Sequence, residues 1–281
     1  TGGLLCRFDD LSGTGILQTR GLVADGALVF DATRGASQTF VIDHNPDQNI
    51  TVHLDADGGG ALGAGFSSAG TMTVRDGIAV ASAGGFLGYK DGVTGTGLVT
   101  GPGSTWTNAD VLHIGYDGTG ALDVTDGGCL HTEELYVGTR GNGTLAIRSG
   151  GTVQVNGETW VSRYSEASGA IRFANGALVT GSLLAAAADL SGSGTVYAHG
   201  LVSDVDVVFD AAHGTRPTFS ISQQSGQDIA VHLDVDGSGV LGAGFAGSGT
   251  MSVTDGVAVA ATEGYVGHRS GASGAVQVQG H

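Results

Sequence analysis

Proline, cysteine, lysine and aromatic residues are all scarce in this chain of 281 residues. It has 3 prolines, 2 cysteines and a single lysine, Lys90, and aromatic residues make up 6% of it. No stretch approaches the roughly 18 to 20 apolar residues of a membrane span, so membrane insertion is not expected. Cys6 and Cys129 are expected to be free thiols, because the position that matches Cys6 in an internal repeat holds Ala185.

Positive charge is scarce as well. The chain has 11 Lys and Arg against 27 Asp and Glu, which gives a formal net charge of −16. Phosphate contacts need clustered Lys and Arg, so a nucleic-acid partner is not expected. An acidic surface favours solubility and divalent cations, and it resists non-specific association.

Glycine is abundant, with 53 residues, and hydrophobic residues reach 41%. A strict Gly-x-y period is missing, so the chain is not a collagen. The apolar residues are mostly small or β-branched, which suits a thin core between β-sheets.

The chain repeats itself at an offset of 179 residues (189 − 10 = 179). Residues 1–102 match residues 180–281 without a gap; for example, His53-Leu54-Asp55 recurs as His232-Leu233-Asp234. A repeat of this kind predicts stacked structural units. We expect the chain to hold one long period and part of the next, as a piece of a longer protein.

A shorter sequence repeat lies inside the long one. Five glycines open similar stretches at spacings of 25, 25, 23 and 26 residues: Gly70, Gly95, Gly120, Gly143 and Gly169. The expected short coils are about 70–94, 95–119, 120–142, 143–168 and 249–273. In each coil an alternating strand comes first, with Leu122 and Val124 inward and Asp123 outward, and an Asp-Gly, Asn-Gly or Ser-Gly turn follows.

The repeat phase predicts an all-β chain, a parallel β-helix (β-solenoid) with Gly-rich turns and one continuous body over 1–281. Strands 4.8 Å apart would give a rod on the order of 55 Å long from roughly twelve coils. Two aliphatic ladders are expected, Leu122 with Leu145 and Ile171, and Val124 with Ile147 and Phe173. Antiparallel hairpins are the alternative, because Asp-Gly is also a strong hairpin signal.

Two segments do not follow the short repeat, 22–57 and 201–236. We expect them to be coils of irregular outline in the same core. The alanine-rich stretch 182–190 is long enough for one helical turn only.

The stretch Gly103-Ser-Thr-Trp106, followed by Leu112-His-Ile-Gly115 and Gly120-Ala-Leu-Asp-Val124, resembles the type V secretion / PEP-CTERM-associated repeat family. Residues 70–180 and 249–281 fit it, and Glu158-Thr-Trp160 resembles a degenerate second copy of the Trp motif. The resemblance implies an exported, elongated β-helix of an autotransporter-like bacterial surface protein. The resemblance carries no catalytic residues to transfer. It also implies secretion or a cell-surface location.

A calcium site is one hypothesis for the repeated turn that holds Asp55 and Asp57, and again Asp234 and Asp236. Alternating carboxylates on a Gly-rich turn can wrap Ca²⁺, which needs six to eight oxygens. However, the glutamate at the twelfth position of an EF-hand is missing, since Phe66 stands there. A turn held by Asx hydrogen bonds explains the same residues without a metal.

Other residues raise the question of catalysis. His53 and His232 suit either a metal or acid–base site or simple solvent-facing positions on strands. The acidic residues Glu133, Glu134, Glu158 and Glu166 do not repeat, and neighbours on a strand point to opposite faces. Three turn aspartates, Asp76, Asp126 and Asp255, suit cation uptake along one edge or ordinary turn chemistry. No catalytic, cofactor-binding or metal-binding residue is assigned on this basis.

The sequence thus predicts a non-enzymatic structural or adhesive module of a long secreted bacterial surface or filament protein. Its expected partners are copies of itself, flanking repeats, or cell-surface and matrix glycans. End-to-end stacking is expected, because open solenoid ends expose strand edges. Two alternatives stay open, a carbohydrate-binding or carbohydrate-cleaving β-helix with Tyr116, Tyr136 and Tyr164 as an aromatic row, and a Ca²⁺-dependent adhesion module.

Overall fold

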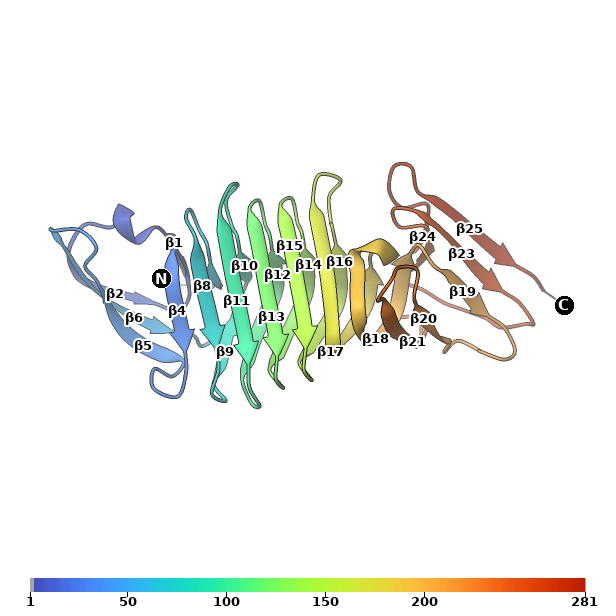
Figure 1. Cartoon of the computed structure of the whole chain (residues 1–281), viewed down its shortest axis with the longest axis horizontal. Helices are drawn as coiled ribbons and strands as arrows, with labels where there is room; N and C mark the ends of the chain where they lie inside the picture. The colour runs from blue at the N-terminus through green and yellow to red at the C-terminus, as the bar shows by residue number, and fades with distance from the viewer. Residues whose placement is uncertain (1–2, 281) are drawn as a thin grey trace.

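The computed structural model describes residues 3–280, and it consists almost entirely of β-strands stacked along one axis (Figure 1). The strands are β1 (Leu4–Cys6), β2 (Gly13–Thr19), β3 (Leu22–Ala24), β4 (Gly26–Phe30), β5 (Ser37–Ile42), β6 (Gln48–Asp55), β7 (Leu62–Ala64), β8 (Gly70–Val74), β9 (Ala79–Ser82), β10 (Gly85–Leu87), β11 (Thr94–Thr100), β12 (Thr105–Ile114), β13 (Thr119–Thr125), β14 (Cys129–Val137), β15 (Asn142–Arg148), β16 (Thr152–Val161), β17 (Ser168–Leu184), β18 (Leu190–Ser203), β19 (Asp206–Phe209), β20 (Thr218–Ile221), β21 (Asp228–Leu233), β22 (Leu241–Ala243), β23 (Ser248–Val253), β24 (Gly264–Val266) and β25 (Ser273–Val278). Two 3₁₀ turns, η1 (Phe8–Asp10) and η2 (Ala187–Asp189), complete the elements.

Parallel pairing between successive coils confirms the predicted β-helix. The five glycines that open the short coils stand in register, one above another: Gly70, Gly95, Gly120, Gly143 and Gly169. Each coil therefore repeats the same path, and its backbone hydrogen bonds run along the axis of the stack.

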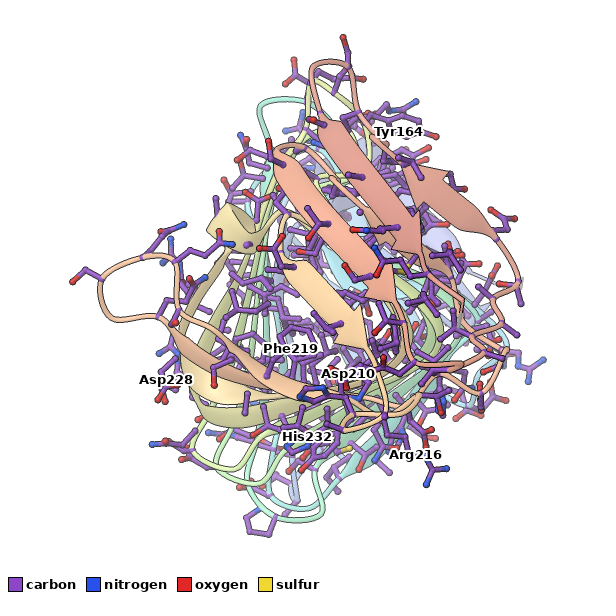
Figure 2. All side chains as sticks on the ribbon, turned by 90° about the vertical axis from the view of Figure 1, so that its right-hand side faces the viewer. Tyr164, Asp210, Arg216, Phe219, Asp228 and His232 are labelled. Carbon is purple, nitrogen blue, oxygen red and sulfur yellow. The ribbon has the colours of Figure 1, made fainter. Side chains whose placement is uncertain are left out.

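Each regular coil contributes to three faces, which Figure 2 shows from the C-terminal end. Face 1 contains β4, β8, β11, β13, β15, the starts of β17 and β18, β19, β23 and β25. Face 2 contains β2, β6, β9, the starts of β12, β14 and β16, the middles of β17 and β18, and β21. Face 3 contains β1, β3, β7, β10, the ends of β12, β14, β16, β17 and β18, β22 and β24. Among the described residues, face 3 thus stacks eleven strand segments.

The core lies between the three faces and consists of apolar ladders. Leu122, Leu145 and Ile171 stand in register, and so do Val124, Ile147 and Phe173. All six side chains are at most 3% exposed. The two ladders have the residues that the alternation of inward and outward positions predicts, and hydrophobic burial of this kind is the main stabilising term for the stack.

Trp106 is a core residue of face 2. It is fully buried, and its indole Nε1 donates a 2.9 Å hydrogen bond to the hydroxyl of Ser82. Trp160 is not its counterpart, although the sequence motif suggests one. The residue in register with Trp106 two coils later is Val153, whereas Trp160 is in register with Tyr136 on face 3.

The Asp-Gly and related turns join face 1 to face 2. Asp76, Asp126, Ser149, Asn175 and Asp255 have φ values between 48° and 63°. This left-handed conformation is one that Asn, Asp and Gly tolerate best, which explains why those residues recur at this corner.

The irregular segments, expected as coils of irregular outline in the same core, carry a feature that regular coils lack. Each contains one antiparallel pair, β5 with β6 and β20 with β21, and we call β5 and β20 the arm strands. The arm strand β5 occupies the edge of β6 that faces the next coil, so β6 does not pair with β9. The parallel pairing at this level of face 2 is limited to one bridge, between Asp57 and Ala81. Ile42, Ile50 and Val52 form a separate small core under β5, whereas the matching residues under β20 belong to the main core, namely Ile221, Ile229 and Val231. In Figure 1 the sheet of β2, β6 and β5 lies at the blue end, apart from the central stack.

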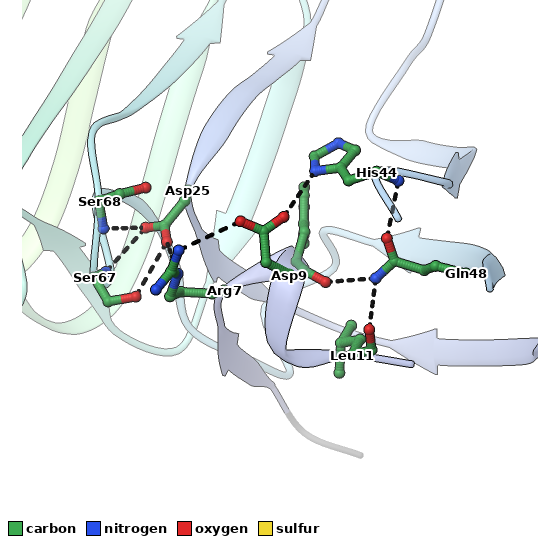
Figure 3. A network of polar contacts seen from close by, with 9 residues as sticks. Arg7, Asp9, Leu11, Asp25, His44, Gln48, Ser67 and Ser68 are labelled. Atoms are coloured by element: carbon green, nitrogen blue, oxygen red, sulfur yellow. Dashed lines mark hydrogen bonds and ion pairs between the residues drawn. The ribbon is translucent and has the colours of Figure 1, made fainter. Parts of the chain in front are cut away.

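A buried glutamine fixes each arm to the body. Gln48 Nε2 donates to the carbonyl oxygens of Phe8, at 2.6 Å, and Leu11, at 2.8 Å (Figure 3). In the second long repeat Gln227 Nε2 donates to the matching carbonyl oxygens of Ala187 and Leu190, at 2.8 and 2.6 Å. The two repeats therefore share internal polar contacts as well as strands.

Candidate functional site

Two hollows lie at matching places on face 2, one in each long repeat. We call them hollow 1, with a volume of about 480 Å³, and hollow 2, of about 330 Å³. Eight positions of hollow 1 have counterparts in hollow 2 at the offset of 179, namely Gln18/Tyr197, Thr19/Ala198, Arg20/His199, Ser37/Arg216, Thr39/Thr218, His53/His232, Leu54/Leu233 and Asp55/Asp234. Each hollow is formed where an arm strand lies beside the parallel strands of face 2.

The repeated histidines point outward into these hollows. His53 is exposed while its neighbours Val52 and Leu54 are buried, because successive residues of a strand face opposite sides. The Thr39 hydroxyl lies 2.8 Å from His53 Nδ1, and the Thr218 hydroxyl lies 3.3 Å from His232 Nδ1. The threonine comes from the arm strand in both repeats, so the arm orients the imidazole. Figure 2 shows His232 and Arg216 on one side of the molecule and Tyr164 on the opposite side.

The four aspartates of the repeated turn are held by basic and hydroxyl groups. Ser37 donates to Asp55 at 2.6 Å, and Arg20 Nε donates to Asp57 at 2.8 Å. The hydrogen bond from Arg20 lowers the pKa of the Asp57 carboxyl.

In the second repeat Arg216 Nε donates to Asp234 at 2.8 Å. The Ser238 hydroxyl donates to Asp236 at 2.6 Å and lowers the pKa of that carboxyl. Within residues 3–280 no group of three or more His, Cys, Asp or Glu is placed to hold a metal ion. Each of the four carboxylates thus accepts at least one hydrogen bond within the protein.

A third hollow, of about 510 Å³, adjoins hollow 2, and His199 lines both. We call it hollow 3, and it also contains Glu134 and Glu158, which come from neighbouring coils. Trp160 Nε1 donates to Glu158 at 2.6 Å, and the Tyr136 hydroxyl donates to Glu134. Hollows 2 and 3 thus meet at His199.

The other two glutamates of the predicted acidic group lie apart from hollow 3. Glu133 accepts a 3.0 Å hydrogen bond from Asn156 Nδ2, and Glu166 accepts one of 3.1 Å from Ser165. The structure thus brings Glu134 and Glu158 together and separates them from Glu133 and Glu166.

An aromatic stripe runs along the outside of face 3 and its corner with face 1. It consists of Phe66, Phe86, Tyr89, His113, Tyr116, Tyr136, Trp160, Phe245, Tyr265 and His268. The rings of successive coils stack; for instance, Tyr89 and Tyr116 have centroids 5.2 Å apart and planes at 12°. Such pairs add specific attraction beyond the area that they bury.

Cationic side chains cover the remaining ring faces of the stripe. The guanidinium carbon of Arg163 lies 4.4 Å from the ring centre of Tyr136 and 4.3 Å from that of Trp160. Tyr116 stacks on Tyr89 and carries Arg140 at 4.7 Å. Because these faces are occupied, Tyr116 and Tyr136 do not form the open aromatic row that sequence reasoning considered, and Tyr164, 49% exposed, is the open ring of the three.

The stripe and the paired hollows are features that sequence reasoning missed. A signal for the stripe was present, since an aromatic or histidine residue directly follows the corner glycine in Gly65-Phe66, Gly88-Tyr89, Gly115-Tyr116, Gly244-Phe245 and Gly267-His268. The hollows had a weaker signal, the retention of Thr, His and Asp at 39, 53 and 55 in the second repeat.

Comparisons of the chain with protein-family models, with curated proteins and with solved structures found no match. Among the described residues, no helix is long and apolar enough to span a membrane.

Proposed function

We propose that this chain is a structural or adhesive module of a long secreted bacterial surface or extracellular filament protein. The observation that carries the proposal is the core, in which apolar ladders pass from coil to coil. Each coil buries the apolar face of its neighbour, so length is added at a nearly constant stability per coil. The resemblance to the type V secretion / PEP-CTERM-associated repeat supports the location outside the cell.

The aromatic stripe supports the same role. It links coils across the outside of the rod, as the core ladders do inside. Trp160 contacts Phe245 and His268, which lie about one hundred residues further along the chain, at ring-centre distances of 6.4 and 5.4 Å. A side chain that ties distant coils together resists their separation under load.

End-to-end association between copies is part of this proposal. Val266 of β24 is 59% exposed and Val278 of β25 is 73% exposed. Within residues 3–280, β25 pairs with β23 on one edge, and its other edge is the place for the next coil of a longer chain or for a second copy. Such an edge pairs readily with another strand.

Electron microscopy and light scattering over a concentration series test the proposal. Rods that lengthen with protein concentration are expected. The double substitution Val266→Lys and Val278→Lys should abolish the lengthening and leave single rods, whereas Val41→Lys, on an exposed position of β5, should not. Compact particles, or rods of one length at every concentration, would contradict it. Adding millimolar Ca²⁺ in parallel separates the Ca²⁺-dependent alternative, which requires a rise in melting temperature.

A further inference from the structure

The paired hollows are the strongest unexplained feature of the surface. Roughly half of the aligned positions differ between the two long repeats, and four of the eight paired lining positions differ as well. The outward-facing threonine, histidine and aspartate are nevertheless present in both, with the same Thr–His contact. The retained residues include outward-facing polar ones, which the apolar core does not require.

The lining of each hollow offers hydrogen-bond donors and acceptors in fixed positions. In hollow 1 the Nδ1 atom of His53 is engaged by Thr39, and the exposed imidazole lines the hollow. Nearby charges are paired with each other, Arg20 of hollow 1 with Asp57 outside the lining, and Arg216 with Asp234 in hollow 2. Paired charges retain free lone pairs and N–H groups, while their net charge is close to zero.

This chemistry excludes several classes of ligand. Each hollow carries one arginine and one aspartate in its lining, Arg20 and Asp55 or Arg216 and Asp234, so its formal charge favours neither an anion nor a cation. An apolar ligand would leave the polar lining without hydrogen bonds, which is costly. A neutral ligand with many hydroxyl groups, each both donor and acceptor, satisfies such a lining.

We propose that hollows 1 and 2 are saccharide-binding sites that occur once per long repeat and recognise neutral sugar units through the retained Thr–His–Asp set. This proposal goes beyond the scaffold role and does not depend on it.

Hollow 2 is the stronger of the two sites. Tyr197 stands where hollow 1 has Gln18, is 46% exposed, and stacks on His232 with ring centres 4.9 Å apart and planes at 13°. An exposed aromatic ring beside polar groups suits the apolar face of a pyranose ring.

Hollow 3 adjoins hollow 2 at His199 and has Glu134 and Glu158 in its lining. An oligosaccharide bound at hollow 2 would reach hollow 3 as well, so we expect it to bind better than a monosaccharide.

An NMR titration of the ¹⁵N-labelled chain tests the proposal, with cellohexaose, maltohexaose, xylohexaose and the anionic hexagalacturonate as probes. We expect at least one neutral hexaose to shift the amide signals of both hollows, with dissociation constants about tenfold lower at hollow 2. His232→Ala should weaken binding at hollow 2 about tenfold and leave hollow 1 unchanged, and His53→Ala should do the reverse. His131→Ala, on β14 and outside both hollows, is the matched control.

Exchanging the residues that distinguish the hollows makes the test sharper. Tyr197→Gln should reduce hollow 2 toward the affinity of hollow 1, and Gln18→Tyr should strengthen hollow 1. All of these side chains lie on the surface, and unchanged circular dichroism of each variant shows that it folds. Three results would overturn the proposal: no shifts with any neutral hexaose, shifts that map elsewhere, or tightest binding of hexagalacturonate. None of them would affect the microscopy test of the scaffold role.

Discussion

The imidazole of His113 lies flat against the ring of Phe86 in the preceding coil, with ring centres 5.1 Å apart and planes at 9°. Burial, together with the nearby positive charges of Arg163 and Arg140, lowers the pKa of His113 from 6.5 to about 4. The ring is therefore neutral in the folded protein at physiological pH, and it takes up a proton more readily once the chain unfolds.

We predict that this histidine makes the fold sensitive to acid. As the pH falls, the histidine of the unfolded chain binds a proton before that of the folded chain. The contribution of neutral His113 to stability is therefore complete above pH 6.5 and is lost as the pH falls toward 4. The loss should be on the order of 2 kcal/mol, because the side chain is only half-buried. Melting temperatures at pH 7.5 and 4.5 test this. In the variants His113→Phe and His113→Gln, the melting temperature should fall less between pH 7.5 and pH 4.5 than it does in the wild type. Equal acid sensitivity in the wild type and both variants would contradict the assignment.

The glycines that open the short coils are predicted to tolerate no side chain where neighbouring coils touch. A Cβ atom on Gly143 would lie 2.1 Å from the nitrogen of Gly138 and 2.3 Å from the oxygen of Ile114. Both are backbone atoms, so Gly143→Ala should cost more than about 3 kcal/mol or prevent folding. Gly15→Ala is the control, because a Cβ there meets no atom within 4 Å, and its change should stay within about 1 kcal/mol. Thermal melts of the two variants give the comparison.

Gln227 is predicted to hold its arm in place. Replacing it with alanine leaves the carbonyl oxygens of Ala187 and Leu190 without their hydrogen bonds, and it also removes those that Oε1 accepts from the backbone N–H groups of Gln223 and Gln224. This should cost about 2 to 4 kcal/mol. The effect should be local, so hydrogen exchange should accelerate at η2 and β21 before the rest of the stack. Gln277→Ala, on the exposed face of β25, should leave the exchange pattern unchanged. Uniform acceleration over the whole chain would show that the contact is not local.

The two thiols are predicted to react slowly and at different rates. Burial and the carboxylates of Asp25 and Asp10 raise the pKa of Cys6 to about 11, and burial raises the pKa of Cys129. Because the thiolate is the reactive form, labelling by a disulfide reagent at pH 7.5 should be slow and should accelerate with pH. The half-buried Cys129 should react first, and Cys129→Ser should remove the faster phase. A single rapid phase for both thiols would contradict the burial of Cys6.

The regular part of the fold could be predicted because its rules are local. Gly120, the alternation of Leu122 and Val124, and the turn after Asp126 recur in each coil, and a two-residue period fixes which side chains enter the core. Stacking then follows from the repeat, since equal coils place equal residues one above another. The same reasoning placed the Asp-Gly corners correctly.

The arms and hollows could not be predicted in this way. Ser37 and Asp55 are 18 residues apart and meet only because β5 folds back on β6. Neither the long nor the short sequence repeat predicts this antiparallel pairing. The motif around Trp160 resembles a degenerate copy of the one around Trp106, but it does not reveal that Trp160 lies on face 3, in register with Tyr136. Surface contacts between coils depend on register over two dozen residues, and a shift of one residue moves a side chain from the core to the outside.

The arm strands also determine how the molecule responds to bending. At β5 the backbone connection along face 2 is reduced to the bridge between Asp57 and Ala81, while faces 1 and 3 continue through β4–β8 and β3–β7. Two intact ladders and one interrupted ladder make this level more compliant than the regular coils, and in one direction only. Because β20 holds the same place on β21, the compliant level returns once per 179-residue period. A polymer of such periods would behave as a jointed rod that follows a curved surface, rather than as a stiff needle.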